Sequence, residues 1–296
     1  MRQGAALRRV LRGAALLLAY AVLAASGLGF AAEPPAKPSR IVSLNMCTDE
    51  LVLRLADPAA IASVTWLSQD PRNANMAQAA RRVPANHGLV EELLAFRPDL
   101  VIAGSFTTRS TVALLKRVRA PVREFGVPRD LAGVKAQIAE MAALLGEPAR
   151  GEALIDEIDA RLAALARRIG EERPKALVLR PNGFTVGRGS LVDEILTRAG
   201  FVNLAAELGI DNYGQIALET VALGEADILI LNTTEGGPPS LAHEVLNHPL
   251  IGRLGDRLRL VALPSRLWTC AGPAVIDAIE MLIDAAAAPR NRRSGP

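Results

Sequence analysis

One stretch decides the fold: ARGEALIDEIDARLAALARRIGEE, residues 149–172. Its apolar side chains recur every three or four residues, at Leu154, Ile158, Leu162, Leu165 and Ile169. This spacing, with no internal proline, predicts one amphipathic helix roughly 35 Å long at about 1.5 Å per residue. Pro174 follows and ends it. Such a helix would be a rigid connector between the sequence before it and the sequence after it.

Short β-branched runs alternate with helical patterns on both sides of this helix, which indicates an α/β protein with mainly parallel sheets. Before it, strands are predicted at 40–44, 61–66, 100–103 and 121–125, and helices at 49–56, 89–96, 108–118 and 131–145. After it, strands are predicted at 175–179, 227–231 and 257–263, and helices at 191–199, 218–223 and 273–286. Between the first strand and the first helix, GFTVGRGS (183–190) predicts a hairpin followed by a helix start at Ser190.

The two halves resemble each other. GLVEELLAFRPDLVIAG (88–104) and QIALETVALGEADILILN (215–232) both read as a helix, an acidic turn and a buried strand. Each has a glutamate in the first turn of its helix, Glu91 in one and Glu219 in the other, where the helix dipole favours negative charge. The repeat predicts two pseudosymmetric lobes.

The amino terminus has the pattern of a secretory signal peptide. Four arginines precede an apolar run at 14–25, which is shorter than the roughly 20 residues of a membrane-spanning helix, and small residues follow up to Ala31. We therefore expect removal of residues 1–31 and a soluble periplasmic protein. Four of the 34 basic side chains leave with this segment, so 30 remain against 31 acidic ones. A near-neutral chain gives no reason to expect nucleic acid as a partner.

The chain has two cysteines, Cys47 and Cys270. In an oxidising compartment they could form a disulfide across a very long loop, or remain as two free thiols. The sequence leaves both possibilities open. Metal ligation is disfavoured, because neither cysteine has a second cysteine or a histidine nearby at the spacing of a ligand pair.

Four segments together resemble the periplasmic binding proteins for ferric siderophores and cobalamin. They are RIVSLNMCTDELVLRLADPAAIASVT (40–65), the 88–104 unit, the long central helix, and LPSRLWTCAGPAVIDAIEML (263–282). The resemblance covers nearly all of 39–286. It implies two Rossmann-like lobes, 39–146 and 174–286, joined by one interlobe helix at 147–173, with the ligand in the cleft and limited closure on binding. The remaining residues, 287–296, are predicted to be a disordered tail.

The resemblance also implies a function and a partner. The chain would be the binding component of an ABC importer, a monomer without a resident cofactor, delivering a metal chelate to an inner-membrane permease and its ATPase. In that family a glutamate of each lobe docks onto arginines of the permease, and the matching residues here are Glu91 and Glu219. Carboxylates on a rigid frame suit charge-assisted hydrogen bonds to arginine.

Ligand residues are expected in the loops that follow parallel strands, because these loops line the cleft of open α/β sheets. Tyr213 and Trp268 are aromatic residues suited to planar or catecholate ligands, and Arg180 and Arg266 could pair with anionic oxygens. The predicted ligand-binding set is Asn45, Met46, Cys47, Trp66, Ser105, Arg180, Tyr213, Arg266 and Trp268.

Two other functions remain as alternatives. An enzyme using Cys47 as nucleophile would need a nearby base, and His87, His243 and His248 have no recognisable partner motif. A binding protein for bare Zn²⁺ or Mn²⁺ would need three or four clustered ligands. The spacing of His243 and His248 does not align them on one helical face, and both are expected to cap or flank a short helix before Pro249. We therefore predict no catalytic residues and no metal ligands.

Overall fold

The computed structural model describes residues 37–233, 242, 244–255 and 257–287, all within one compact unit that starts at Lys37. The expected signal peptide, His243 and the tail from residue 288 onward lie outside the described residues. Within the described residues, no helix is both long and apolar enough to cross a membrane.

The first lobe, β1 to α6, contains a parallel sheet with the strand order β3-β2-β1-β4-β5. The strands β1 and β4 are fully buried, as expected for a parallel sheet covered on both faces. The strands are β1 (Ile41–Ser43), β2 (Ile61–Thr65), β3 (Ala85–Asn86), β4 (Leu100–Gly104) and β5 (Val122–Phe125), and the helices are α2 (Met46–Leu55), α3 (Ala77–Ala80), α4 (Val90–Ala95), α5 (Arg109–Arg117) and α6 (Leu131–Leu144).

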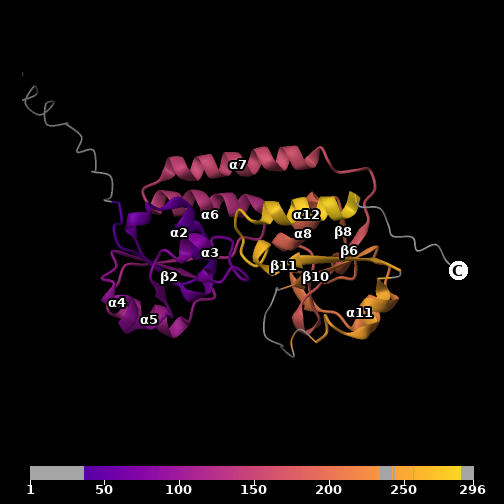
Figure 1. Cartoon of the computed structure of the whole chain (residues 1–296), viewed down its shortest axis with the longest axis horizontal. Coiled ribbons are helices and arrows are strands. Elements are labelled where there is room, and N and C mark those ends of the chain that lie inside the picture. The colour runs from indigo at the N-terminus through magenta and orange to yellow at the C-terminus, as the bar shows by residue number, and fades with distance from the viewer. Residues whose placement is uncertain (1–36, 234–241, 243, 256, 288–296) are drawn as a thin grey trace, which may run out of the picture. The chain divides into compact units, whose positions relative to one another are not determined.

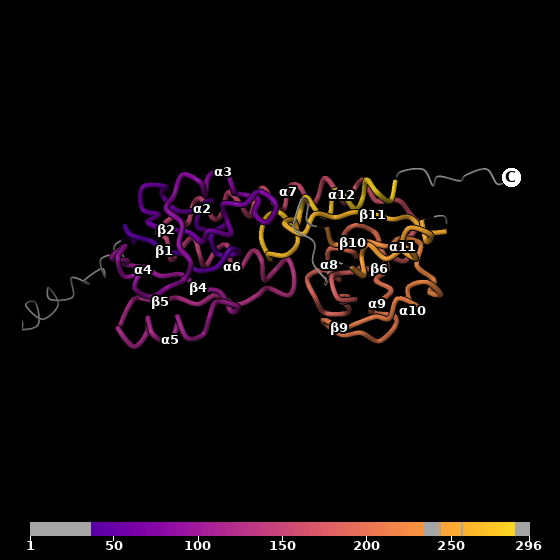
Figure 2. Tube along the Cα trace, turned by 60° about the horizontal axis from the view of Figure 1, so that its bottom comes forward, coloured from indigo at the N-terminus to yellow at the C-terminus, as the bar shows by residue number. Residues whose placement is uncertain are grey.

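The second lobe, β6 to α12, repeats this plan with a parallel sheet of order β11-β10-β6-β8. Figure 2 labels the first three of these strands, β11, β10 and β6. The two-lobed α/β architecture predicted from the repeated sequence is confirmed. The strands are β6 (Lys175–Leu179), β8 (Val202–Asn203), β10 (Ile228–Thr233) and β11 (Arg259–Pro264), and the helices are α8 (Leu191–Arg198), α9 (Leu204–Glu207), α10 (Leu218–Leu223), α11 (Pro249–Leu254) and α12 (Val275–Ala287).

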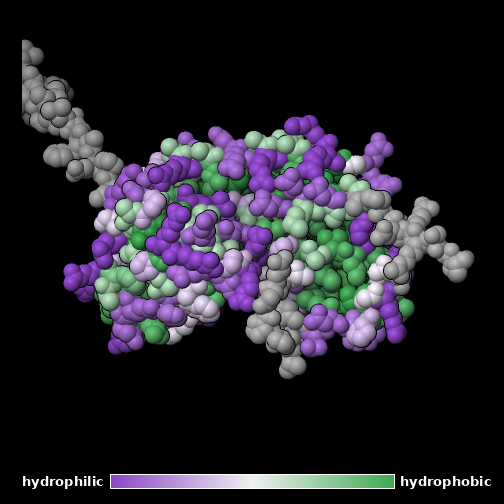
Figure 3. Space-filling model, in the orientation of Figure 1, coloured by the Kyte–Doolittle hydropathy of each residue, from purple (hydrophilic) through white to green (hydrophobic). Residues whose placement is uncertain are grey.

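The long helix α7 (Pro148–Ala166) packs on α6 of the first lobe and on α12 of the second (Figure 1). A turn at Gly146, with φ +70°, reverses the chain between α6 and α7. The two helices approach closely, since a Cβ on Gly151 would lie 2.4 Å from the Cβ of Ala142. Hydrophilic residues predominate along α7 in Figure 3.

The helix α7 is shorter than the prediction of 149–172. It ends at Ala166, so its length is about 28 Å at about 1.5 Å per residue. The apolar periodicity extends to Ile169 because this side chain packs against the core and beside Gly200 from outside the helix. The prediction extended the helix too far because apolar spacing alone does not separate a helical turn from a packed loop.

Two features of the second lobe differ from the prediction. The GFTVGRGS segment does not form a local hairpin, because β7 (Phe184–Val186) pairs antiparallel with the distant β9 (Tyr213–Gln215). Its predicted helix start is correct, since the Ser190 side chain accepts a hydrogen bond from the N–H of Asp193 and caps α8. Likewise, His248 caps a helix that begins at Pro249 rather than one that precedes it.

The hydrophobic core is continuous from one lobe to the other along the α7 side. One cluster contains buried side chains from α2 and α6, from α7 and from α8 and α12, including Leu51, Ile138, Ile158, Ile195 and Ile279. Separate clusters fill the other faces of the two sheets. The lobes therefore share buried apolar surface and are not joined by a single connector alone.

Candidate ligand-binding site

The residues after β1 and β4 mostly serve the local structure. The Asn45 side chain accepts a hydrogen bond from the N–H of Cys47 and so caps α2. It also lies against Gly104, where an added Cβ would be 2.7 Å from the Asn45 Cγ. Ser105 donates to the carbonyl of Phe125 at 3.1 Å. Two of the predicted ligand residues, Asn45 and Ser105, thus have their polar groups engaged within the first lobe.

An exposed aromatic pair lies at the ends of β2 and β3. Trp66 is 51% exposed and stacks on His87, with ring centroids 6.3 Å apart. Glu92 orients His87 through two contacts, accepting from its backbone N–H at 2.8 Å and lying 3.3 Å from Nδ1. His87 was not predicted as a site residue, because the two-residue strand β3 before it gives no periodic signal.

Beneath this edge of the sheet lies a buried carboxylate, Asp49, in the first turn of α2. Its Oδ2 accepts hydrogen bonds from the N–H and hydroxyl of Thr65 and from the hydroxyl of Ser68. Burial raises the pKa of Asp49 to about 6, although these hydrogen bonds lower it. The carboxylate therefore fixes the segment that carries Trp66.

In the second lobe, Arg180 follows β6 and lies with its guanidinium 5.3 Å from the ring centre of Trp268. Tyr213 lies beside it, 54% exposed and stacked on Phe184 with centroids 4.9 Å apart. Burial lowers the pKa of Arg180, opposed by a hydrogen bond to Tyr213. Among the described residues no carboxylate pairs with Arg180, and its Nε has no hydrogen-bond partner. This half-buried cation is the strongest candidate for binding an anionic group.

Trp268 is 3% exposed, and its Nε1 donates to Asn232 Oδ1 at 2.6 Å. The ring belongs to the core and supports Arg180, so it does not provide an open face at the surface. Trp268 belongs to the predicted ligand-binding set, and its burial favours a place in the core of the lobe.

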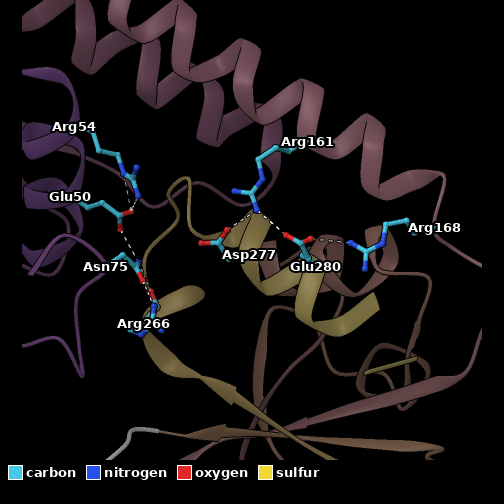
Figure 4. A network of polar contacts seen from close by, with 8 residues as sticks. All are labelled: Glu50, Arg54, Asn75, Arg161, Arg168, Arg266, Asp277 and Glu280. Carbon is cyan, nitrogen blue, oxygen red and sulfur yellow. Dashed lines mark hydrogen bonds and ion pairs between the residues drawn. The ribbon is translucent and has the colours of Figure 1, made fainter. Parts of the chain in front are cut away.

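The remaining predicted residues lie where the two lobes meet. Cys47 of α2 and Cys270, which follows β11, form a disulfide with their Cα atoms 5.1 Å apart. Arg266 Nη1 donates to Asn75 Oδ1 at 2.9 Å, and Asn75 Nδ2 donates to the carbonyl of Arg266 at 2.8 Å (Figure 4). Met46 lines a cavity of about 10 Å³ here, together with Asn75, Arg266 and Cys270. Ligand pockets usually measure about 300 to 1,000 Å³, so this cavity is far too small for a chelate.

Glu91 and Glu219 are exposed in the first turns of α4 and α10, one in each lobe. The described residues contain no group of three or more histidine, cysteine, aspartate or glutamate side chains that could hold a metal ion. The disulfide occupies both sulfurs, so Cys47 is not available as a free thiolate.

The sequence matches a known family of binding proteins. The chain matches the periplasmic binding protein family over residues 41–254, which is more than half its length, and it belongs to that family. The family and its solved members are substrate-binding proteins rather than enzymes.

Individual relatives of the chain include proteins that bind cobalamin or heme. The cobalamin-binding proteins of two Halobacterium salinarum strains are 24% identical over 198 residues, which are 66% of this chain but only 54% of theirs. The chain thus matches about half the length of these curated relatives. Among solved structures, the heme-binding protein RhuT from Roseiflexus sp. RS-1 is 26% identical with a TM-score of 0.67, covering 84% of this chain and 99% of RhuT.

Two more distant structures show the shared fold. A periplasmic heme-binding protein of Pseudomonas aeruginosa is 24% identical with a TM-score of 0.70, covering 85% of this chain and 94% of its own. The vitamin B12-binding protein BtuF of Vibrio cholerae is 18% identical with a TM-score of 0.65, covering 85% and 97%.

Proposed function

We propose that this chain is the substrate-binding component of an ABC importer and captures a metal chelate that carries an anionic group, such as a ferric siderophore, a heme or a cobalamin-type corrinoid. The observation that carries the proposal is Arg180, a half-buried guanidinium with no carboxylate partner among the described residues. A charge removed from water without a partner is costly, and an anionic ligand group would provide that partner. Relatives that bind heme and cobalamin support the chelate class.

In this proposal Trp268 supports the guanidinium from below, and Tyr213 and Trp66 offer exposed aromatic faces from the two lobes. The remaining residues of the predicted set would hold the loops that carry these groups. The ligand would lie between the lobes but outside the small cavity beside Asn75, which is too narrow for it.

The class of ligand is tested by titrating the purified protein with ferric hydroxamate, ferric catecholate, hemin, cyanocobalamin and zinc chloride in a calorimeter. Tight binding of at least one chelate is expected. Tight binding of zinc with no binding of any chelate would favour the free-metal alternative and overturn the proposal.

The role of Arg180 is tested with Arg180→Gln. Losing a charge-assisted contact worth about 1.5 to 3 kcal/mol should weaken chelate binding about 10- to 100-fold. The exposed Arg253 of the same lobe, changed to Gln, is the control and should leave affinity unchanged. Equal affinities for all three proteins would show that Arg180 does not contact the ligand.

We further propose that Glu91 and Glu219 dock onto basic residues of the permease. Both carboxylates are exposed, and each stands at the start of a helix that packs on its lobe. The double variant Glu91→Gln/Glu219→Gln should bind the ligand with normal affinity but lose stimulation of the transporter's ATPase. Glu152→Gln, on the exposed face of α7, is the control. Full stimulation by the double variant would contradict the docking proposal.

A further inference from the structure

Three polar or covalent contacts hold the two lobes to each other, in addition to the helix α7 and the hydrophobic core that the lobes share. The first is the Cys47–Cys270 disulfide, which connects residues 223 positions apart. Cys47 lies in the first turn of α2, and Cys270 lies between the short helix Ser265–Leu267 and α12. The bond therefore ties the carboxyl edge of the first sheet directly to the segment after the edge strand of the second.

The second contact is the amide pair of Asn75 and Arg266 (Figure 4). The amide oxygen of Asn75 accepts a hydrogen bond from the Arg266 guanidinium, and the amide nitrogen of Asn75 donates one to the Arg266 carbonyl. Its amide nitrogen also lies 3.3 Å from Glu50 Oε2, and Arg54 neutralises Glu50 from the same helix. Arg266 is thus committed to a neighbour in the opposite lobe.

The third contact lies on different elements. Glu194 of α8 accepts a hydrogen bond of 2.6 Å from the N–H of Leu131, at the start of α6. On the same side, Arg161 of α7 bridges Asp277 and Glu280 of α12 (Figure 4). Rotation of one lobe about α7 would have to break the disulfide, the Asn75–Arg266 pair or the hydrogen bond between Glu194 and Leu131.

We propose that the Cys47–Cys270 bond and the Asn75–Arg266 pair form an interlobe latch that sets the width of the opening between the lobes. Bound and free protein then have the same opening, and ligands are selected by whether they fit it. Asn75 and Arg266 determine specificity in this way without touching the ligand. The effect on ligand choice rests on the proposed function, whereas the effect on the opening does not.

The opening is tested without any ligand by pulsed electron–electron resonance between spin labels at Ser110→Cys and Thr220→Cys, both exposed and one in each lobe. Labelling under non-reducing conditions, checked by mass, leaves the native disulfide intact. The parent should give one narrow distance distribution. Adding Cys47→Ser, Cys270→Ser and Asn75→Ala should broaden it and add longer distances. Identical distributions would overturn the latch, whatever the protein binds.

A second measurement addresses selection in the unlabelled full chain. Once one chelate is found to bind, its affinity is compared with that of a bulkier analogue in the parent, in Asn75→Ala and in the triple variant. The latch predicts that the preference for the smaller ligand falls about tenfold in the triple variant, equal to about 1.4 kcal/mol. The nearby Asn73→Ala, whose amide contacts Asp70 within its own lobe, should keep the preference. An unchanged preference in the triple variant would refute the specificity role.

Discussion

At the residue scale, Asp49 couples the stability of the first lobe to pH. It is fully buried, and its carboxylate accepts three hydrogen bonds from Thr65 and Ser68 around a single oxygen. Burial raises its pKa because the charged carboxylate loses its hydration, and the hydrogen bonds to the carboxylate oppose this rise only in part.

The pKa of Asp49 is about 6 in the folded state against 3.8 for an ordinary aspartate. Between about pH 4 and 6 the folded state therefore holds a proton that the unfolded state has lost, and stability falls as pH rises through this window. A shift of about two units amounts to about 3 kcal/mol. The free energy of unfolding of Asp49→Asn, measured with urea and taken relative to the parent, should therefore increase by about that much as the pH is raised from 4 to 7.

The control for this prediction is Asp156→Asn, an exposed position on α7. It should leave the difference from the parent constant across the same pH range. If the stability curves of Asp49→Asn and the parent ran parallel, Asp49 would not be the group that holds the proton.

The sequence predicted which loops lie at the ends of the strands, but it did not predict which side chains of those loops are exposed. Following parallel strands to their carboxyl ends selected Arg180 and Trp66, which lie at the lobe edges. The same rule also selected Trp268 and Arg266, although the indole of Trp268 is buried against Asn232 and Arg266 contacts the opposite lobe. Those outcomes depend on contacts between segments far apart in the chain, and local patterns carry no information about them.

At the scale of elements, the β7–β9 pair depends on a close approach at Gly187. A Cβ there would lie 1.8 Å from the carbonyl oxygen of Ile210, while the N–H of Gly187 donates to Asn212. Only glycine lets the loop before α8 lie directly on the loop before β9.

Gly187→Ala should therefore lower the free energy of unfolding by about 3 kcal/mol, because the backbone must move to admit the methyl group. Gly170→Ala is the matched control, since nothing lies within 4 Å of its added Cβ. That variant should be neutral or more stable by up to about 1 kcal/mol. Guanidinium unfolding of both variants measures these changes. If Gly187→Ala were as stable as Gly170→Ala, the close approach of Gly187 to the Ile210 carbonyl would be contradicted.

Element types followed from the sequence where the signal was long and local. Buried runs such as 100–103 gave the central strands, and the capping serine at 190 gave the start of α8. The short strands β3 and β8 were missed, because two residues in a ladder have no period to detect. The pairing of β7 with β9 was missed because 26 residues separate them along the chain.

At the scale of the whole molecule, the disulfide restricts the unfolded chain more than any local contact. Removing a bond that closes so long a loop should cost about 2 to 5 kcal/mol. Guanidinium unfolding of Cys47→Ser/Cys270→Ser is expected to show this loss, and reduction of the parent should reproduce it. The double variant itself should not respond to the reductant, and a parent equally stable in both redox states would rule out this contribution.

The core that runs through both lobes has a consequence for dissecting the protein. Severing the chain beside Gly146 would leave the apolar faces of Ile138 and Met141 in one fragment and those of Ile195 and Ile279 in the other, all now open to water. Each half is therefore expected to aggregate when expressed by itself. In a calorimeter the intact protein should melt in a single cooperative step, and two resolved peaks would mean that the halves are independent folding modules.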